Sequence, residues 1–507
     1  MASDAQPENS APITAHHCPG PPRLRRVLGL GDLVFYGIVL IQPVGAIGTF
    51  GLGNQRSLGH VTTAILFALV AMVLTAVSYG RMAALYPAAG SAYTYVGRGL
   101  NPHLGFVAGW AMFLDYLVIP VVSVIYGAES LRELVGPLPT TPILEAAGRV
   151  LAQCLHQFVE ALAPGRGDSV VAAVGLPLHT GRADLIVWVI VLIALTTFLN
   201  LRGIKWTALS NQVLTAAMCL VIVIFAFEAV RYLMASQGWA GLLSTEPFYN
   251  PRTFSLPAIA SATSLVALTY IGFDGITTLA EDVKDPKRTV PLAVVLTCLF
   301  IGLCACLQVY LAQRIWPDYS TFKNLDTAFF EVCALVGGKF LFNTITLIMA
   351  VACLGSALTG QVGAARILFG MGRDNALPRF FARLDKRSNP ALNIWIIGIL
   401  VLVVSLALNY AGAAELINFG AFLAFLGVNL AVIREFIFRP PAGHKRNWLY
   451  DLVLPGLAFV FCLYIWLSLP KAAKLVGGIW LAAGLIYTAI KTRGFRRTPV
   501  MLDLSGA

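Results

Sequence analysis

Apolar stretches long enough to cross a membrane recur along almost the whole chain, and short polar stretches separate them. A helix needs about 20 mainly apolar residues to span the hydrocarbon core of a bilayer. The pattern therefore predicts an all-α polytopic membrane protein with about 12 transmembrane helices. The predicted spans are 31–53, 60–85, 102–131, 183–200, 207–233, 256–281, 290–313, 338–371, 391–410, 414–437, 449–469 and 473–491.

One of the separating stretches, residues 132–182, is too long for a plain loop. Its section 143–163 has apolar residues at helical spacing, with polar residues such as Arg149 and Gln153 between them. This pattern is typical of an amphipathic helix that lies on a membrane surface. We expect such a helix on the outer surface, because its polar face is too populated for a thirteenth span.

The first and the sixth predicted spans both contain helix-weakening residues. The first has Pro43 within a series of glycines, and the sixth has Gly272 and Gly275 on either side of Asp274. The two spans lie five apart and therefore run in opposite directions through the membrane. Two interrupted helices of opposite direction are typical of inverted-repeat transporters, in which the substrate binds at the breaks.

Close helix packing is the alternative interpretation of these glycines, because Gly45, Gly48 and Gly51 recur every three residues and form a small-residue face. Pro43 favours a break instead, since proline lacks the backbone donor and clashes with the preceding turn. We expect this break near Gly45–Gly48 and the break in the sixth span near Tyr270–Asp274. A break also has a chemical use. The N-terminus of one half-helix attracts a carboxylate, and the C-terminal end of the other attracts an ammonium group. The two breaks together predict a binding site for a zwitterion.

The composition and charge agree with a membrane protein. Of the 507 residues, 58% are hydrophobic and only 12% are charged. The net charge of +11 does not indicate a nucleic-acid partner, because lysine and arginine lie in short loops between apolar runs. That distribution is the orientation signal of membrane proteins. It predicts a multi-pass protein of the cell (inner) membrane with the lipid bilayer as its partner and both termini cytoplasmic.

Clustered catalytic or metal-binding groups are not found in the sequence. The nine cysteines form no CxxC pair, and His60, His103, His156 and His444 are scattered in loops. The group His16-His17-Cys18 could touch a metal, but we expect it to lie in a disordered tail. We therefore expect no enzyme activity, no catalytic residue, no cofactor and no metal site. Residues 1–22 are polar and proline-rich, so we expect no cleavable signal and a first span that is retained.

Several motifs together resemble the amino acid–polyamine–organocation permeases, nearest to the branch that contains the bacterial putrescine importer. They are AVSYGRMAALYPAAGSAYTYVGRGLNPHLGFVAGWAMFLDYLVIP (76–120), LNLRGIK (199–205), GFDGITTLAEDVKDPKRTVP (272–291), ARILFGMGRDNALP (365–378) and INFGAFLAFLGVNLAVI (417–433).

The resemblance implies a LeuT-like inverted repeat of five plus five helices, with broken first and sixth helices. The implied divisions are a disordered cytoplasmic tail (1–27), a first repeat (28–235) that carries the outer insertion 132–182, a second repeat (254–437), two accessory helices (449–491) and a cytoplasmic tail (492–507).

The resemblance also implies roles for individual residues. The stretch Tyr270–Asp274 matches the unwound middle of the sixth helix, and Tyr116 matches a position that contacts substrate. The candidate substrate-binding residues are Val44, Gly45, Ala46, Ile47, Gly48, Asp115, Tyr116, Tyr270, Ile271, Gly272 and Asp274. The candidates for ion coupling or gating are Asp115, Asp274, Ser356, Thr359 and Gln361.

Asp115 lies well inside the third span, where a carboxylate costs about 2.5–3.5 kcal/mol on insertion scales. It is either a counter-charge or proton carrier, or a structural group that bonds to a partner. Gln361 is a buried amide that could instead hold helices together. A sodium site would use first-span carbonyls with the hydroxyls of Ser356 or Thr359.

The sequence thus favours a secondary active transporter that imports amino acids by alternating access, coupled to H⁺ or Na⁺. The stretch Val44–Gly48 offers backbone donors and no acidic side chain, which suits a carboxylate. A polyamine importer of the putrescine type is the alternative, with Asp115 and Asp274 as the acidic groups. An amino-acid sensor that does not transport is the alternative from another class.

Overall fold

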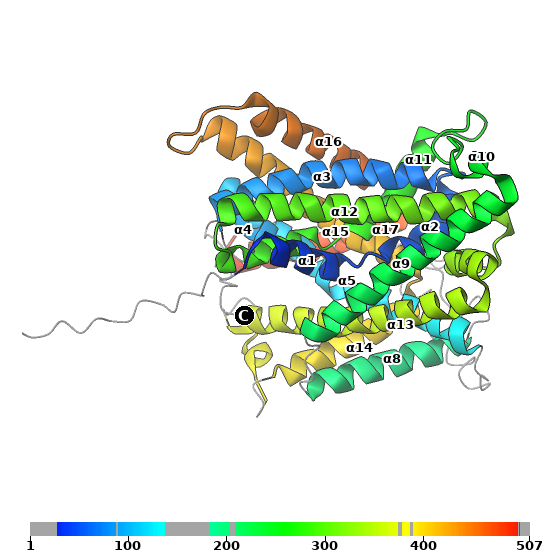
Figure 1. Cartoon of the computed structure of the whole chain (residues 1–507). Coiled ribbons are helices and arrows are strands. Elements are labelled where there is room, and N and C mark those ends of the chain that lie inside the picture. Colours follow the sequence, from blue (N-terminus) through cyan, green and yellow to red (C-terminus); the bar gives the residue numbers. More distant parts are fainter. Residues whose placement is uncertain are drawn as a thin grey trace, which may run out of the picture.

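The chain folds as a bundle of long helices, most of whose axes lie roughly parallel or antiparallel to one another (Figure 1). The computed structural model describes residues 28–87, 90–136, 183–202, 208–373, 378–385, 389–494 and 496. Among these residues, ten helices are long and apolar enough to cross a membrane, or eleven if the bent pair α1 and α2 is one span. The all-α polytopic architecture is confirmed.

Each of the twelve predicted spans coincides with helical structure. The elements are α1 (Leu30–Ile41), α2 (Gly45–Arg56), α3 (Val61–Leu85), α4 (Ser91–Gly99), α5 (Pro102–Val135), α8 (Ala183–Leu201), α9 (Ala208–Gln237), α10 (Trp239–Leu242), α11 (Leu256–Val266), η1 (Ala267–Tyr270), η2 (Phe273–Asp282), α12 (Pro286–Ile315), η3 (Tyr319–Thr321), α13 (Ala328–Arg373), η4 (Arg379–Ala382), α14 (Ala391–Ala407), α15 (Tyr410–Ile433), η5 (Arg434–Phe438), η6 (Leu449–Val453), α16 (Leu454–Leu467) and α17 (Lys471–Lys491).

The structure adds detail at several helices. The short helix α4 was not predicted, and α13 is divided by Gly338, whose φ of 62° is not helical. The apolar helix α14 has 17 residues, so a full set of twelve crossings stays a prediction. The predicted amphipathic helix at 143–163 lies outside the described residues.

The two interrupted segments run antiparallel to each other. At the end of the bundle where α1 begins, which we call the α1 end, Leu28 pairs with Val283 after η2. At the opposite end, His60 follows α2 and Thr253 precedes α11. The Nε2 of His60 lies 3.0 Å from the hydroxyl oxygen of Thr253. Helix α12 packs along both α3 and α1, and α5 packs against α13 and α15.

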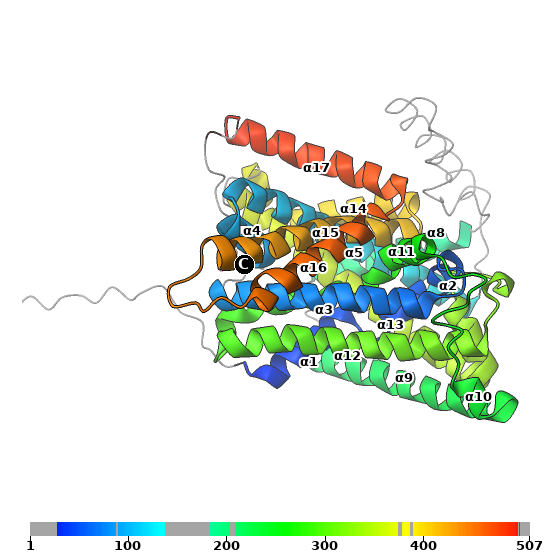
Figure 2. The same ribbon diagram turned by 90° about the horizontal axis from the view of Figure 1, so that it is seen from above.

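The final helix, α17, lies at the edge of the bundle when it is seen from above (Figure 2). It is attached to α5 by Trp110 and Trp480, whose rings stack at 4.8 Å between centroids. Each indole donates to the other residue's backbone carbonyl, at 2.9 Å and 3.0 Å. These bonds satisfy two polar groups that would otherwise be costly in a membrane.

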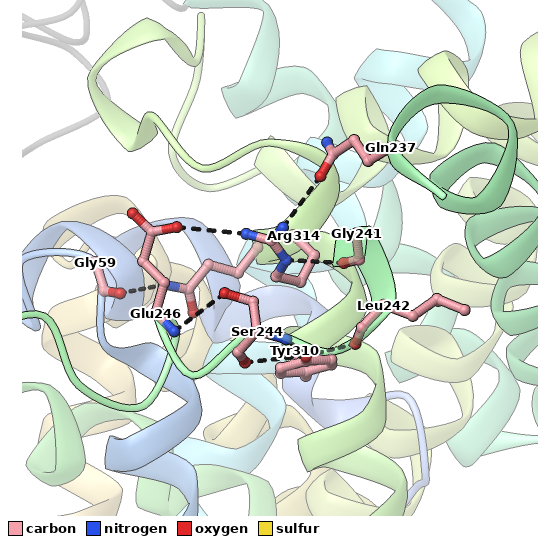
Figure 3. Close-up of polar contacts among 9 residues, drawn as sticks. Gly59, Gln237, Gly241, Leu242, Ser244, Glu246, Tyr310 and Arg314 are labelled. Carbon is pink, nitrogen blue, oxygen red and sulfur yellow. Dashed lines mark hydrogen bonds and ion pairs between the residues drawn. The ribbon is translucent and has the colours of Figure 1, made fainter. Parts of the chain in front are cut away.

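A polar network at the opposite end of α12 fixes the connection between α9 and α11 (Figure 3). Arg314 Nε donates to the carbonyl of Gly241 at 3.0 Å, and one Nη donates to Gln237 at 3.1 Å. Tyr310 donates its hydroxyl to the carbonyl of Leu242 at 2.6 Å. Gln313 donates to the carbonyl of Gly59 in the turn between α2 and α3. The end of α12 therefore holds two connections at once, the one between α9 and α11 and the turn between α2 and α3.

Candidate functional site

The first interrupted helix breaks between Ile41 and Gly45, and its halves are bent by 50°. Gln42 has a φ of 66°, outside the helical region. Pro43 lacks an N–H, so it cannot continue the hydrogen bonding of α1. The predicted break at Gly45–Gly48 is therefore displaced: these residues form the first turn of α2, because glycine weakens a helix but still donates its N–H.

The second interruption lies within the predicted stretch Tyr270–Asp274. Regular α winding ends at Val266 and continues as the tighter 3₁₀ helix η1. Ile271 is then extended, with a ψ of 133°, and Gly272 has a φ of 115°. Only glycine adopts such a left-handed backbone readily. The chain resumes as the 3₁₀ helix η2, so the second segment changes winding instead of bending sharply.

A small cavity of about 130 Å³ lies where the two breaks meet. Gly45 and Gly48 of α2 line it from the first segment, and Leu268 and Ile271 line it from the second. Among the described residues, none that lines this cavity is charged. The polar side chains in its wall are Gln42, Ser123, Tyr126, Cys353, Ser356 and Tyr410. The cavity is thus mostly apolar, with a few neutral hydrogen-bonding groups and the N-terminal turn of a helix.

A larger cavity of about 910 Å³ extends from the breaks toward the α1 end. The two cavities share lining residues such as Leu40, Gln42 and Ile271. Asp32, which is exposed near the start of α1, is the one charged residue in the wall of the larger cavity within the described part of the chain. A solute in the small cavity therefore has a route to the α1 end.

The opposite end is closed above the breaks. Arg56, at the end of α2, forms an ion pair with Glu415 of α15. The Glu415 side chain is only 5% exposed, so the pair is largely removed from water. The Phe50 ring packs edge-on against Phe329, at 5.6 Å between centroids. Ion pair and aromatic contacts join α2 to its neighbours on this side.

About half of the residues predicted for the site line a cavity. Gly45, Gly48, Ile271 and Ser356 line the small cavity. The larger one is lined by Tyr116, Ile271, Gly272, Ser356 and Thr359. The other seven predicted residues are not among those that line either cavity. They are Val44, Ala46, Ile47, Asp115, Tyr270, Asp274 and Gln361.

Two of these residues instead bond between helices. Tyr270 donates its hydroxyl to the carbonyl of Ile65 in α3, at 3.0 Å. Gln361 donates to the hydroxyl of Thr197 at 2.9 Å and accepts from the amide of Asn200 at 2.8 Å. Both therefore join neighbouring helices, and for Gln361 this is the alternative that the sequence left open.

Asp115 and Asp274 form a buried acidic pair beside the cavities. Each side chain is 5% exposed, and the charge of Asp274 acts on Asp115. Neither carboxylate is paired with a basic side chain among the described residues. The Ser91 hydroxyl of α4 bonds to the Asp274 carboxylate. One oxygen of Asp115 has no hydrogen-bond partner in the described part of the chain. Two carboxylates buried together without a cation are an arrangement suited to holding a proton.

Sequence reasoning missed several residues of the site. Tyr126 and Tyr410 line the small cavity with their rings 5.0 Å apart, and the Tyr126 hydroxyl has no partner among the described residues. Nothing distinguishes these tyrosines from other aromatic residues in apolar spans. Gln308 and Asn418, which bond to the breaks, were also missed. In the sequence, each of them is a lone amide side chain within an apolar span, and such an amide must find a hydrogen-bond partner.

Comparison with known proteins places the chain in a family. The family described as "Amino acid permease" matches residues 33–490. The chain is 33% identical to the low-affinity putrescine importer PlaP of Escherichia coli (strain K12), over 93% of this chain and 95% of that protein.

Two further relatives share a lower sequence identity with the chain. The chain is 26% identical to the branched-chain amino acid permease BcaP of Lactococcus lactis subsp. cremoris (strain MG1363), over 86% of this chain and 87% of that protein. It is 25% identical to the methylthioribose transporter of Bacillus subtilis (strain 168), over 91% and 90%. The resemblance of the motifs is confirmed: the chain belongs to the amino acid permease family.

Proposed function

We propose that this protein is a secondary active transporter that imports an α-amino acid across the cell membrane. The observation that carries the proposal is the small uncharged cavity between two helix breaks. Such a cavity must match a solute of zero net charge, because a buried charge without a partner is costly. An α-amino acid meets that condition while it still carries two charges for recognition.

The two ends of the broken first helix provide that recognition. The first turn of α2, with Gly45 and Gly48 at the cavity, presents the positive end of a helix dipole to a carboxylate. The last turn of α1, with Leu40 and Ile41 at the same cavity, presents carbonyls to an ammonium group. The apolar side chains of the wall then accept an uncharged amino-acid side chain.

A polyamine is the second candidate, because the putrescine importer PlaP is 33% identical to this chain. A diamine carries two positive charges and no carboxylate. The wall of the small cavity offers it no acidic side chain, and the acidic pair Asp115 and Asp274 lines neither cavity. The geometry therefore favours the amino acid.

Alternating access is the transport mechanism that this arrangement supports. The larger cavity reaches the α1 end, while the Arg56–Glu415 pair closes the other end. With both termini cytoplasmic, as the loop charges predict, the larger cavity faces the cytoplasm. The antiparallel course of the two broken segments supports an inverted repeat of five plus five helices.

A proton is the coupling ion in our proposal. The buried pair Asp115 and Asp274 would take up and release it during the cycle. A sodium site is the alternative, because its candidate hydroxyls keep oxygen lone pairs: Thr359 donates to the carbonyl of Gly355 at 3.0 Å, and Ser356 accepts from Ser123 at 2.9 Å.

The coupling proposal is tested with Asp115→Asn and the matched control Asp318→Asn, which changes an exposed carboxylate in a loop. Uptake driven by a proton gradient should be lost in Asp115→Asn, while counterflow continues, and the control should equal the wild type. Full gradient-driven uptake by Asp115→Asn would remove this residue from coupling. A dependence on sodium that survives a protonophore would overturn the proton.

The transport proposal is tested by uptake in proteoliposomes with neutral, acidic and basic amino acids and with putrescine. We expect uptake of a neutral amino acid, with little competition from putrescine. Putrescine uptake alone would establish the second candidate. Binding of an amino acid without uptake or counterflow would indicate a sensor.

A further inference from the structure

Two amide side chains from neighbouring helices bond to the backbone at the two breaks. Gln308 of α12 donates through Nε2 to the carbonyl of Pro43 at 3.0 Å. Asn418 of α15 donates through Nδ2 to the carbonyls of Ser264 at 2.8 Å and Leu265 at 3.3 Å. Gln308 is 1% exposed and Asn418 is fully buried. Each amide therefore approaches a break from the protein interior.

The bond from Gln308 replaces a bond that a continuous helix would make. In a regular α-helix, the carbonyl of Pro43 would accept from the N–H four residues later, that of Ile47. Here the Ile47 N–H bonds to the carbonyl of Val44, at 3.0 Å. The Pro43 carbonyl would then be buried without a donor, which is unfavourable inside a membrane. Gln308 supplies the missing donor.

Asn418 acts at the corresponding point of the second segment. Ser264 and Leu265 lie in the last turn of α11, just before the winding changes to η1. Carbonyls in the last turn of a helix lack their usual partners. One amide reaches two of them, so it fixes the place where α11 ends.

We propose that Gln308 and Asn418 are positioning residues that set the geometry of the two breaks and thereby the shape of the small cavity. Neither residue lines the cavity. They act through Pro43 and through the end of α11, whose following residues Gly45 and Leu268 do line it. This inference rests on the proposed transport function, since it assigns the two residues a role in substrate binding.

The chain contains a matched control for each residue. Gln313, also on α12 and 5% exposed, donates to the carbonyl of Gly59, in a turn away from the breaks. Asn429, also on α15 and fully buried, bonds to the hydroxyl of Thr75 at 3.4 Å. Each control loses a buried amide on the same helix and leaves the breaks unchanged.

The experiment compares Gln308→Met with Gln313→Met, and Asn418→Leu with Asn429→Leu, in uptake assays of the purified full-length protein. We expect the substrate KM to rise by about tenfold or more in the two break variants and to stay within about twofold in the two controls. Equal KM changes in a variant and its control would overturn the proposal, since loss of any buried amide would then suffice. Unchanged KM in both break variants would overturn it as well.

A second measurement separates this proposal from the choice of substrate. Cys353 lines the small cavity, so the rate at which a small thiol reagent modifies it reports the shape of the cavity without any substrate. We expect a change of about threefold or more in Gln308→Met and none in Gln313→Met. Equal rates would overturn the positioning role, whereas a wild type that transports no amino acid would overturn only the proposed function. If Gln308→Met does not fold, Gln308→Glu, which keeps the side-chain shape, is judged by the same criteria.

Discussion

The two interrupted helices reach the same cavity by different physical means. The first is bent by 50° over three residues, and side chains of other helices hold it. Gln308 bonds to Pro43, Gln42 bonds to the carbonyl of Ala352 at 3.3 Å, and Arg56 pairs with Glu415. The second is also bonded by a side chain of another helix, Asn418 of α15, but its irregularity lies in its own backbone at Gly272, whose φ is 115°.

This difference shows where each break can be damaged. A break held by tertiary bonds should respond to changes in distant partners and tolerate a methyl group at a helical glycine that has space around it, such as Gly45. A break that depends on a left-handed glycine should respond to a single methyl group at that position. The three predictions below test this contrast, from the largest expected effect to the smallest.

Arg56→Met should have the largest effect, on stability. It removes the partner of the buried Glu415 carboxylate, and loss of one member of a buried ion pair costs about 3 kcal/mol or more. We expect a clear fall in the thermal unfolding midpoint of the purified protein. The double variant Arg56→Met with Glu415→Gln should recover most of the loss. No recovery in the double variant would show that the ion pair does not hold α2.

Gly272→Ala should have the next largest effect. Its φ of 115° is unfavourable for any residue with a Cβ, at a cost of about 1–3 kcal/mol. The added carbon would meet nothing closer than about 3.5 Å, so the effect is conformational and not a clash. We expect uptake to fall by about tenfold, since 1.4 kcal/mol corresponds to that factor. Wild-type uptake would mean that the second break does not depend on its glycine.

Gly45→Ala should have the smallest effect. It places the same methyl group in the first break, where the backbone is helical and the nearest atom, the Thr269 Cα, lies 3.7 Å away. We expect uptake within about twofold of the wild type, because alanine is well tolerated in a helix. A loss as large as that of Gly272→Ala would contradict the contrast between the two breaks.

The sequence was sufficient to predict the helices, because long apolar runs between charged loops leave few other structures in a membrane. It also located Gly272 within the second break, since glycine next to a carboxylate in a span has few structural explanations. It placed the first break a few residues late, near Gly45–Gly48, because Pro43 indicates a break but does not specify which neighbouring residues lose the helical backbone. The actual interruption starts at Gln42, directly before the proline.

The cavity walls were harder to predict, because they depend on how helices pack. Tyr126 and Tyr410 are 284 residues apart in the chain by the difference of their numbers, and only the fold brings their rings together. Asp115 was predicted to contact substrate, and it is not among the residues that line either cavity. Hydropathy reports depth in the membrane and does not report which neighbour a side chain faces.

The pairing of Leu28 with Val283 has a mechanical consequence. The Lys284 N–H donates to the Leu28 carbonyl at 3.2 Å, so the start of α1 is joined to the chain that follows η2. We expect α1 and η2 to move together, because this backbone bond joins their ends. A joint tilt of the two would then close the larger cavity, whereas separate movement would first have to break the bond.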